Sequence, residues 1–305
     1  MQPLTNLATW SIIMKNFSTS LKAAIGAIVL SMSAGAGAVA ITTDVITVVD
    51  ESGSMSGEHA WLGGMIQSLD AAFNTVAAGD PVSTQYGLVG FGGAGSHLAG
   101  HKHNVGGGDF GTAPQYAAAT GSLVLNGGFE DGYSGIHTAL NDYTLRPTAR
   151  TNVILVTDED RDNLNTNSLT FSSILNNLKA ENALLNAVVN ARFRCSDGSS
   201  ALGMDSSGKG YKADGSGGVT TCGSASAWFG AGSTISDYVK LALATGGAAW
   251  DLNQLRAGGL KADSFTKAFI DVKVQETIRP VPEPGTLALL GLGLAGLGFR
   301  RKLSA

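Results

Sequence analysis

The sequence predicts an α/β fold built around a mostly parallel sheet. Apolar runs of strand length alternate with helical stretches along the middle of the chain, and this alternation is typical of the class. The 305 residues are 44% hydrophobic, which is enough to bury a sizeable core, and the 42 glycines indicate long glycine-built loops. We therefore expect one globular domain at 41–280, between two tails.

The first predicted strand is the apolar run DVITVV at 44–49, and a helical stretch from Glu58 to about Ala78 follows it. The later elements are expected as strands at 84–91, 152–157 and 183–191 and as helices at 134–143, 167–180, 233–245 and 263–274. Residues 92–122 are rich in glycine and lack periodicity, so we expect an irregular insertion there. In such sheets, ligands bind beyond the carboxyl ends of the strands.

The N-terminal segment at 1–40 is typical of a secretory signal peptide. Lys15 and Lys22 precede an apolar stretch that ends in the small-residue triplet Ala-Val-Ala, which predicts cleavage after Ala40. Met14 directly precedes the basic region, so translation starts either there or at the first residue. The chain is expected to be exported.

The C-terminal segment carries a second sorting address. A Pro-Glu-Pro turn at Pro282, Glu283 and Pro284 precedes an apolar stretch and a basic cluster at 300–302. Over 281–305 this order resembles the PEP-CTERM sorting signal of Gram-negative bacteria that secrete exopolysaccharide. The resemblance implies a transmembrane helix that anchors the chain transiently in the inner membrane, and processing by an exosortase-type enzyme. It also implies a final location at the cell surface or in the extracellular matrix.

The domain between the tails is acidic. Residues 41–280 hold 15 Lys and Arg against 23 Asp and Glu, a net charge of about −8. A domain of this charge repels nucleic acid, and the sequence contains no basic stripe that would overcome the repulsion. We therefore exclude nucleic acid as a partner.

Both cysteines, Cys195 and Cys222, lie in the exported part of the chain. In an oxidising compartment a disulfide between them is the default expectation. It would close a second glycine-rich insertion near 195–222. Two free thiols are the alternative, although no CxxC motif supports redox chemistry.

The loop VVDESGSMSG at 48–57 places Asp50, Ser52 and Ser54 at alternate positions directly after the first predicted strand. Asp158 ends the later apolar run VILVTD, so it is expected at the same edge of the sheet. Carboxylates and hydroxyls are hard oxygen ligands that suit Mg²⁺, Mn²⁺ or Ca²⁺. The sequence therefore predicts a divalent cation site at this edge.

An apolar strand followed by DxSGS, with a later strand that ends in Asp, resembles the von Willebrand factor type A family over residues 42 to about 275. The resemblance implies a Rossmann-like, mostly parallel sheet flanked by helices, and a metal-ion-dependent adhesion site, or MIDAS. Asp50, Ser52, Ser54 and Asp158 match that site, with Mg²⁺ as the first choice of ion and Mn²⁺ or Ca²⁺ as alternatives.

The second loop of the predicted site departs from the common family pattern. The family usually donates a Thr there, whereas GGFEDGYSGI at 127–136 looks more like the version of the integrin β subunit, in which a Glu takes that place. We choose Glu130 as the ligand, with Asp131 as the runner-up. A third carboxylate lowers the positive charge left on the ion, which leaves the choice between Mg²⁺ and Ca²⁺ open.

Three neighbouring features have plainer explanations. For the DxSGS loop, the alternative to a metal site is an ordinary helix N-cap made by Ser52 or Ser54. The run DEDRDN at 158–163 starts like an EF-hand, but its twelfth position is a leucine, so only a neighbouring Ca²⁺ held by Asp160 or Asp162 remains as an alternative. The third feature is HLAGHKH, which is expected to be a solvated loop, with opportunistic Zn²⁺ binding as the alternative; its histidines are His97, His101 and His103.

These features together predict a non-enzymatic surface protein that binds a partner through a metal ion. In the family's mode, a carboxylate from an unknown protein or matrix ligand completes the coordination of the ion. The alternative is a structural component of the exopolysaccharide matrix in which the metal only stabilises the fold. The sequence shows no general base next to a nucleophile, and the GxSxG motif of serine hydrolases is absent.

Overall fold

The computed structural model describes residues 41–164 and 168–278. The predicted signal peptide at 1–40 and the predicted sorting segment at 281–305, with its predicted membrane helix, lie outside these residues, so the structure does not test them. Within the described ranges, no helix is both long and apolar enough to cross a membrane.

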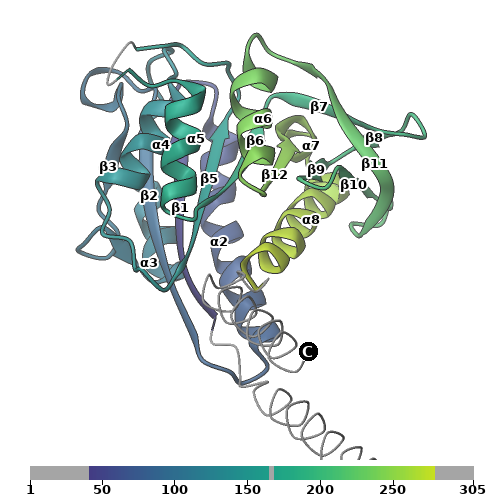
Figure 1. The fold of residues 1–305 in the computed structure, drawn as a ribbon, viewed down its shortest axis with the longest axis horizontal. Coiled ribbons are helices and arrows are strands. Elements are labelled where there is room, and N and C mark those ends of the chain that lie inside the picture. The colour runs from purple at the N-terminus through teal and green to yellow at the C-terminus, as the bar shows by residue number, and fades with distance from the viewer. Residues whose placement is uncertain (1–40, 165–167, 279–305) are drawn as a thin grey trace, which may run out of the picture.

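A parallel sheet forms the centre of the molecule (Figure 1). Its strands, in spatial order, are β2 (Val82–Phe91), β1 (Ile41–Asp50), β5 (Arg150–Thr157), β6 (Leu184–Val189) and β12 (Ala248–Asp251). Nine of the ten residues of β1 are buried, because helices cover both faces of the sheet and leave no side of the strand in water. The runs at 44–49, 84–91 and 152–157 are thus confirmed as strands.

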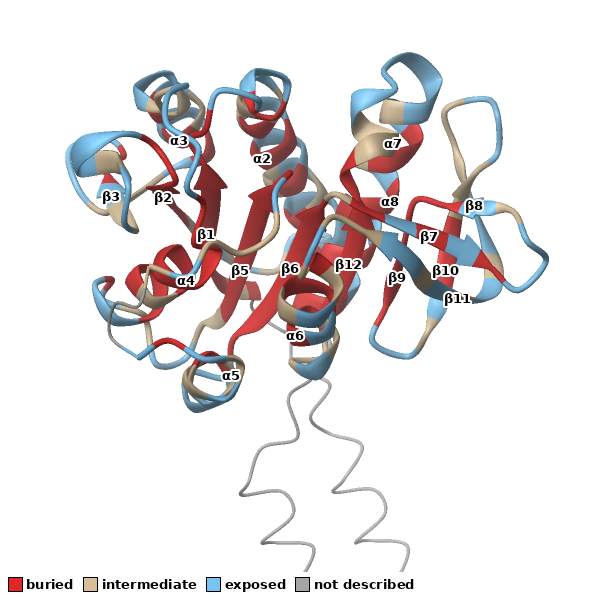
Figure 2. Ribbon diagram, turned by 90° about the horizontal axis from the view of Figure 1, so that it is seen from above, coloured by how far each residue is buried: buried red, intermediate tan, exposed pale blue. Residues whose placement is uncertain are grey.

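Helices pack on both faces of this sheet, so the domain has three layers (Figure 2). One face carries α2 (Ser56–Ala77), α3 (Ala113–Ala119), α7 (Leu252–Arg256) and α8 (Gly259–Ile278). The other face carries α4 (Gly132–Asn141), α5 (Phe171–Ala180), the π-helix η3 (Ile235–Val239) and α6 (Lys240–Ala244). In α2 the buried Leu62, Ile66, Leu69 and Phe73 recur at helical spacing, which gives the helix one apolar stripe against the sheet.

The sheet continues beyond β12 as antiparallel strands that the sequence pattern did not indicate. These strands are β9 (Gly203–Asp205), β10 (Lys209–Ala213), β11 (Val219–Gly230), β7 (Ala191–Cys195) and β8 (Ser200–Ala201). Cys195 and Cys222 form the expected disulfide and link β7 to β11. The predicted sheet was mostly parallel, whereas the observed sheet is mixed: half-exposed antiparallel strands need no continuous apolar run, so Gly and Ser suffice there.

The glycine-rich segment 92–122 lies at the opposite edge of the sheet and is more regular than expected. It contains η1 (Gly95–His97), β3 (His101–His103), β4 (Phe110–Gly111), α3 and η2 (Thr120–Ser122). Both short strands pair antiparallel with β2, and a capping box at Thr112 starts α3. The segment therefore extends the sheet past β2.

The two ends of the described domain lie together, at one pole of the molecule. Ile41, the first residue of β1, and Ile278, the last residue of α8, line the same surface pocket. The opposite pole is formed by the carboxyl ends of the parallel strands, where Asp50 ends β1. Ten residues of extended strand separate these poles by about 30 Å.

Candidate metal centre

The five residues predicted as metal ligands gather at the carboxyl-end pole. Asp50 ends β1, and Ser52 and Ser54 occupy the short loop that leads into α2. Asp158 directly follows β5, and Glu130 lies just before α4. We call these five residues the rim.

A chain of hydrogen bonds connects four members of the rim. The Ser52 backbone N–H donates to Oδ1 of Asp50 at 2.7 Å, and the Ser54 hydroxyl donates to Oδ1 of Asp158 at 3.0 Å. The hydroxyl oxygens of Ser52 and Ser54 are 3.2 Å apart. The side chain of Ser54 is exposed, so the rim opens to solvent on that side.

Glu130 faces Asp50 across Gly92, whose φ is +82°. A Cβ atom on Gly92 would lie 3.1 Å from Oδ1 of Asp50 and 3.1 Å from Cγ of Glu130, so glycine at this position leaves room for both acids. Glu130 therefore lies beside Asp50 at the rim, and its role as the second-loop ligand stays a prediction.

Asp131, the runner-up for that place, has a different set of partners. Its carboxylate accepts from the Tyr133 N–H and caps α4, and it binds Nε of Arg161 at 2.7 Å and the Leu164 N–H at 3.1 Å. These contacts tie the loop after β5 to the start of α4. Glu130 is the better choice, because the oxygens of Asp131 are already engaged away from the rim.

Two rim carboxylates are buried without a cationic partner among the described residues. Burial raises the pKa of Asp50 to about 6, with a smaller contribution from the charge of Asp158, against hydrogen bonds from Ser52 and Thr157. Burial likewise raises the pKa of Glu130 to about 7, and nearby carboxylates, including Asp50, add to the effect. A cation placed between these acids would favour their ionised forms.

Arg256 is a rim neighbour that no sequence pattern predicts. From the end of α7 it contacts Oδ2 of Asp158 at 2.8 Å and Oε1 of the buried Glu58 at 2.7 Å, and it donates to the Ser54 carbonyl at 3.2 Å. Asp158 is thus the rim acid whose charge is already compensated. No pattern in the sequence relates position 256 to the loop about 200 residues earlier.

Thr157 is a second unexpected neighbour, and it joins the two central strands. Its hydroxyl donates to Oδ2 of Asp50 at 2.8 Å, which fixes the orientation of that carboxylate. Asp50 therefore keeps lone pairs for a further partner while both of its oxygens are held in place.

The rim fits a hard divalent cation. All of its side-chain donors are carboxylate or hydroxyl oxygens, and no histidine or cysteine belongs to it. The rim carboxylates do not converge within 4.8 Å of one another, whereas four other described residues do. Because the carboxylates alone are too far apart to surround an ion, the hydroxyls of Ser52 and Ser54 would have to bind it together with Asp50, Glu130 and Asp158. Water molecules would complete the coordination shell of the ion.

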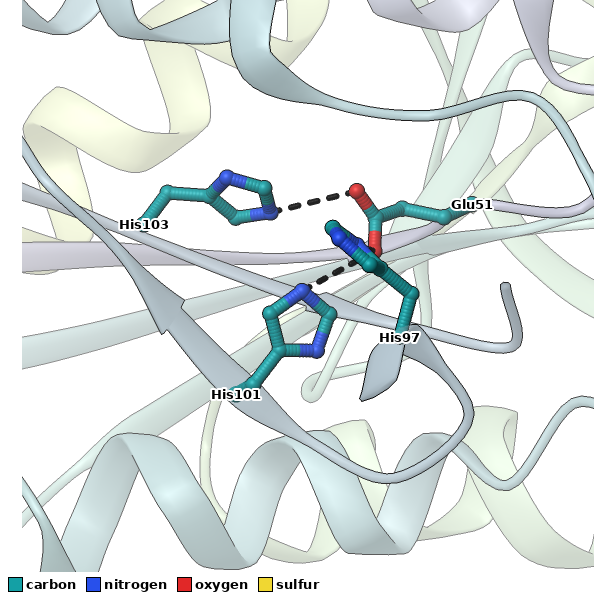
Figure 3. Close-up of side chains that lie close together, drawn as sticks. All are labelled: Glu51, His97, His101 and His103. Atoms are coloured by element: carbon teal, nitrogen blue, oxygen red, sulfur yellow. Dashed lines mark hydrogen bonds and ion pairs between the residues drawn. The ribbon is translucent and has the colours of Figure 1, made fainter. Parts of the chain in front are cut away.

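Those four other residues are Glu51, His97, His101 and His103. The expectation that the three histidines form a solvated loop is wrong, because His103 is buried and all three rings turn toward Glu51 (Figure 3). The acid is adjacent to Asp50 in sequence but faces the other way. The sequence offered only the spacing of the histidines as a signal.

Asp160 and Asp162, the alternative Ca²⁺ ligands, have backbone partners. Asp160 accepts from the Ser233 N–H at 3.0 Å, and Asp162 accepts from the Glu130 N–H at 3.2 Å. The Asp162 N–H also donates to the Glu130 carbonyl at 2.8 Å. The loop after β5 therefore supports the position of Glu130.

Comparison with known proteins identifies one family motif. Residues 280–302 match the PEP-CTERM protein-sorting motif, which implies export, surface sorting and processing by exosortase. No curated protein matches the chain.

Similar solved structures include three of proximal thread matrix protein 1 from the mussel byssus, one with a zinc-occupied MIDAS motif. They share 18–22% identity with this chain at TM-scores of 0.37–0.38, and cover 48–49% of it. The matched part is 35–38% of the length of those proteins.

Proposed function

We propose that this chain is an exported, surface-sorted adhesion protein of the von Willebrand factor type A class. The rim binds a divalent cation, with Mg²⁺ as the first choice, and a carboxylate of a protein or matrix ligand completes the coordination of the ion. The role is one of binding and not of catalysis.

The observation that carries this proposal is the pairing of buried, uncompensated acids with an exposed hydroxyl. Asp50 and Glu130 are at most 4% exposed and have raised pKa values, whereas Ser54 stands open to solvent beside them. An ion held there is stabilised by the acids on its inner side and is reachable by a ligand on its outer side. The sorting motif at 280–302 supports action at the cell surface.

A purely structural metal is the second candidate, and the contacts of the rim favour it in one respect. Hydrogen bonds and ion pairs through the rim already connect β1, β5 and α7, by way of Thr157, Asp158 and Arg256. An ion at the same place would hold these elements together even with no ligand bound. In that case the chain would be a structural component of the exopolysaccharide matrix.

The variant Ser54→Ala separates the two functions. It removes one hydroxyl without leaving a buried charge unpaired, and Ser56→Ala, which truncates an exposed serine two residues later, is the matched control. Binding of Mg²⁺ and Mn²⁺ is measured by calorimetry on the exported protein. Retention on the native cell surface is measured in Mg²⁺ and in EDTA, with circular dichroism as the test of folding.

Adhesion through the metal predicts that a folded Ser54→Ala protein loses both cation binding and EDTA-sensitive retention, while Ser56→Ala keeps both. Asp158→Asn should behave like Ser54→Ala. Retention by a folded Ser54→Ala protein that no longer binds cation would contradict adhesion and would favour the structural role.

A further inference from the structure

Next to the rim lies a second group of potential ligands, which we call the histidine cluster. It consists of Glu51, which follows β1, His97 at the end of η1, and His101 and His103 on β3. One ligand atom from each residue lies within 4.8 Å of all the others (Figure 3). None of these residues belongs to the rim.

The backbone explains why these four side chains meet. Successive residues of an extended chain point to opposite sides, so Glu51 faces away from the side that Asp50 faces. His101 and His103 are two apart on β3 and share a face, and β3 pairs with β2 so that His101 lies opposite Gly90. A Cβ atom on Gly90 would overlap the Glu51 carboxylate and approach Nε2 of His103 to 2.7 Å, so the cluster occupies the space that glycine leaves.

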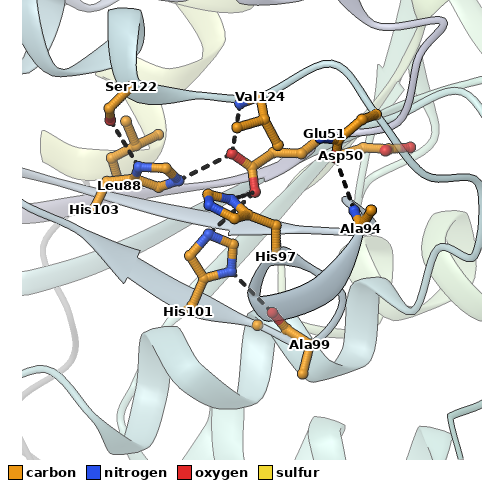
Figure 4. Close-up of polar contacts among 12 residues, drawn as sticks. Asp50, Glu51, Leu88, Ala94, His97, Ala99, His101, His103, Ser122 and Val124 are labelled. Atoms are coloured by element: carbon orange, nitrogen blue, oxygen red, sulfur yellow. Dashed lines mark hydrogen bonds and ion pairs between the residues drawn. The ribbon is translucent and has the colours of Figure 1, made fainter.

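Contacts on the outer side of two rings determine which nitrogen carries the hydrogen. The Ser122 hydroxyl donates to the Ala119 carbonyl, so its oxygen accepts from Nδ1–H of His103 at 2.7 Å. Nδ1–H of His101 donates to the Ala99 carbonyl at 2.9 Å (Figure 4). Each ring is therefore held as the tautomer whose Nε2 lone pair points into the cluster.

Inside the cluster, these nitrogens face a carboxylate. Nε2 of His101 and Nε2 of His103 are buried, and each lies 3.1 Å from an oxygen of Glu51, with no other polar partner among the described residues. Nδ1 of His97 lies 2.7 Å from the same carboxylate. Lone pairs of nitrogen and oxygen that face one another repel unless a proton or a cation lies between them.

The negative charge of Glu51 is a second reason to expect a cation in the cluster. Its side chain is fully buried, and within the described part of the chain its ion-pair partners are the three histidines, with no lysine or arginine. A neutral imidazole brings no positive charge, and a buried carboxylate without compensation is strongly unfavourable. A bound cation would satisfy both the carboxylate and the ring nitrogens.

We propose that the histidine cluster is a closed zinc site, distinct from the rim. The ligands are Nε2 of His101, Nε2 of His103, Nδ1 of His97 and the carboxylate of Glu51. Three imidazoles and one carboxylate suit Zn²⁺ and not Mg²⁺ or Ca²⁺, which take oxygen ligands. Tetrahedral Zn²⁺ with bonds of about 2.0–2.1 Å places its ligand atoms about 3.4 Å apart. The ligand atoms of the cluster lie within 4.8 Å of one another, and the histidine–carboxylate contacts are 2.7–3.1 Å, so the side chains would need only modest shifts to reach that spacing.

Four protein ligands leave no open position, which indicates a structural ion. It would fix the glycine-rich segment 92–122 to the end of β1. Glu51 also holds the next segment, because its carboxylate accepts from the Val124 N–H at 2.9 Å and its carbonyl accepts from the Asn126 N–H at 3.0 Å. That segment leads to Glu130, so zinc would order the loop that completes the rim.

Zinc binding by the exported full-length protein tests this proposal after the metal has been stripped. Zn²⁺ is titrated against a chromophoric chelator, and X-ray absorption at the zinc edge reports whether imidazoles surround the ion. The cluster variants are His101→Gln and His97→Gln. His137→Gln removes a histidine outside the cluster and is the matched control, whereas Ser54→Ala separates the cluster from the rim.

We expect one Zn²⁺ with several imidazole ligands in the wild type, in His137→Gln and in Ser54→Ala. Each cluster variant should bind Zn²⁺ at least about a hundredfold more weakly, because loss of a direct ligand exceeds the effect of losing an outer partner. Zinc should also raise the melting temperature of His137→Gln but not of His101→Gln.

The proposal fails if zinc uptake is lost in Ser54→Ala and kept in His101→Gln, or if the bound ion shows no imidazole. Should the cluster variants not fold, the Co²⁺-loaded wild type decides. A four-coordinate Co²⁺ ion absorbs far more strongly in the visible range than a six-coordinate one, and a weak spectrum would overturn the assignment. None of these readouts depends on adhesion, so the two proposals stand or fall separately.

Discussion

Replacing Asp50 with asparagine should stabilise the metal-free protein and abolish its stabilisation by metal. Asp50 is fully buried at the rim, close to Glu130 and Asp158, and has no lysine or arginine partner among the described residues. Its ionised form is therefore unfavourable when no cation is present. The substitution removes that charge and keeps the size and shape of the side chain.

The size of the stability gain in Asp50→Asn follows from the raised pKa of Asp50. Its rise from 3.8 to about 6 means that ionisation costs about 3 kcal/mol more in the folded protein than in the unfolded chain. Asparagine offers one acceptor oxygen where the carboxylate accepts from both the Ser52 N–H and Thr157, which offsets about 1 kcal/mol. The net gain is about 2 kcal/mol, or about 4–8 °C in melting temperature for a domain of this size.

The sign of the pH dependence follows from the raised pKa. The stability that wild-type Asp50 contributes is complete below pH 3.8 and is lost as the pH rises through about 6. The advantage of Asp50→Asn should therefore be absent near pH 4 and complete by pH 7–8. With metal at a hundred times its dissociation constant, the wild type alone should gain about 2.7 kcal/mol and become the more stable protein.

Urea unfolding at pH 4, 6 and 8, in EDTA and in saturating Mg²⁺ or Mn²⁺, measures these differences. Asp263→Asn, at an exposed position on α8, controls for the loss of one negative charge. An Asp50→Asn protein that is less stable than the wild type in EDTA at pH 8 would refute the account of uncompensated charge. Equal stabilisation of both proteins by metal would refute the role of Asp50 as a ligand.

Reduction of the disulfide and one further variant test contacts outside the Asp50 carboxylate. Reduction of the Cys195–Cys222 disulfide, whose cysteines are 27 residues apart, should cost about 3–4 kcal/mol, and hydrogen exchange should rise in β7 and β11; equal loss of protection in β1 and β5 would contradict this prediction. Arg256→Gln should leave the buried Glu58 unpaired and lower stability by about 2 kcal/mol. The same variant frees Asp158 and should raise Mg²⁺ affinity about fivefold by calorimetry, so an unchanged affinity would argue against competition between arginine and metal.

The parallel half of the sheet could be predicted because its strands are buried on both faces. The run at 44–49 is mostly apolar for that reason, and strands that end at Asp50 and Thr157 bring Asp50 and Asp158 to one pole. The short β12 escaped prediction, because four residues after two glycines make no recognisable run. The strands at 191–230 were missed because half-exposed antiparallel pairs tolerate Gly and Ser.

Of the two candidate sites, the rim could be predicted from the sequence and the histidine cluster could not. The positions of Asp50 and Asp158 followed from the rule on strand ends, and that of Glu130 from a family resemblance. The histidine cluster was missed because it depends on how β3 pairs with β2, and no local pattern fixes that register. Glu51 was also overlooked, because it directly follows the predicted ligand Asp50 in the sequence. Its side chain points to the opposite side, since successive residues of an extended chain alternate.

The positions of the chain ends determine which way the molecule can face. The sorting motif begins two residues after Ile278, which lies at the pole opposite Asp50. Any machinery that holds the chain at that motif would therefore hold it by its base, with the rim directed outward. If the rim binds a cation as proposed, a protein tethered in this way would offer that ion to neighbouring cells or polymers and not to the membrane beneath it.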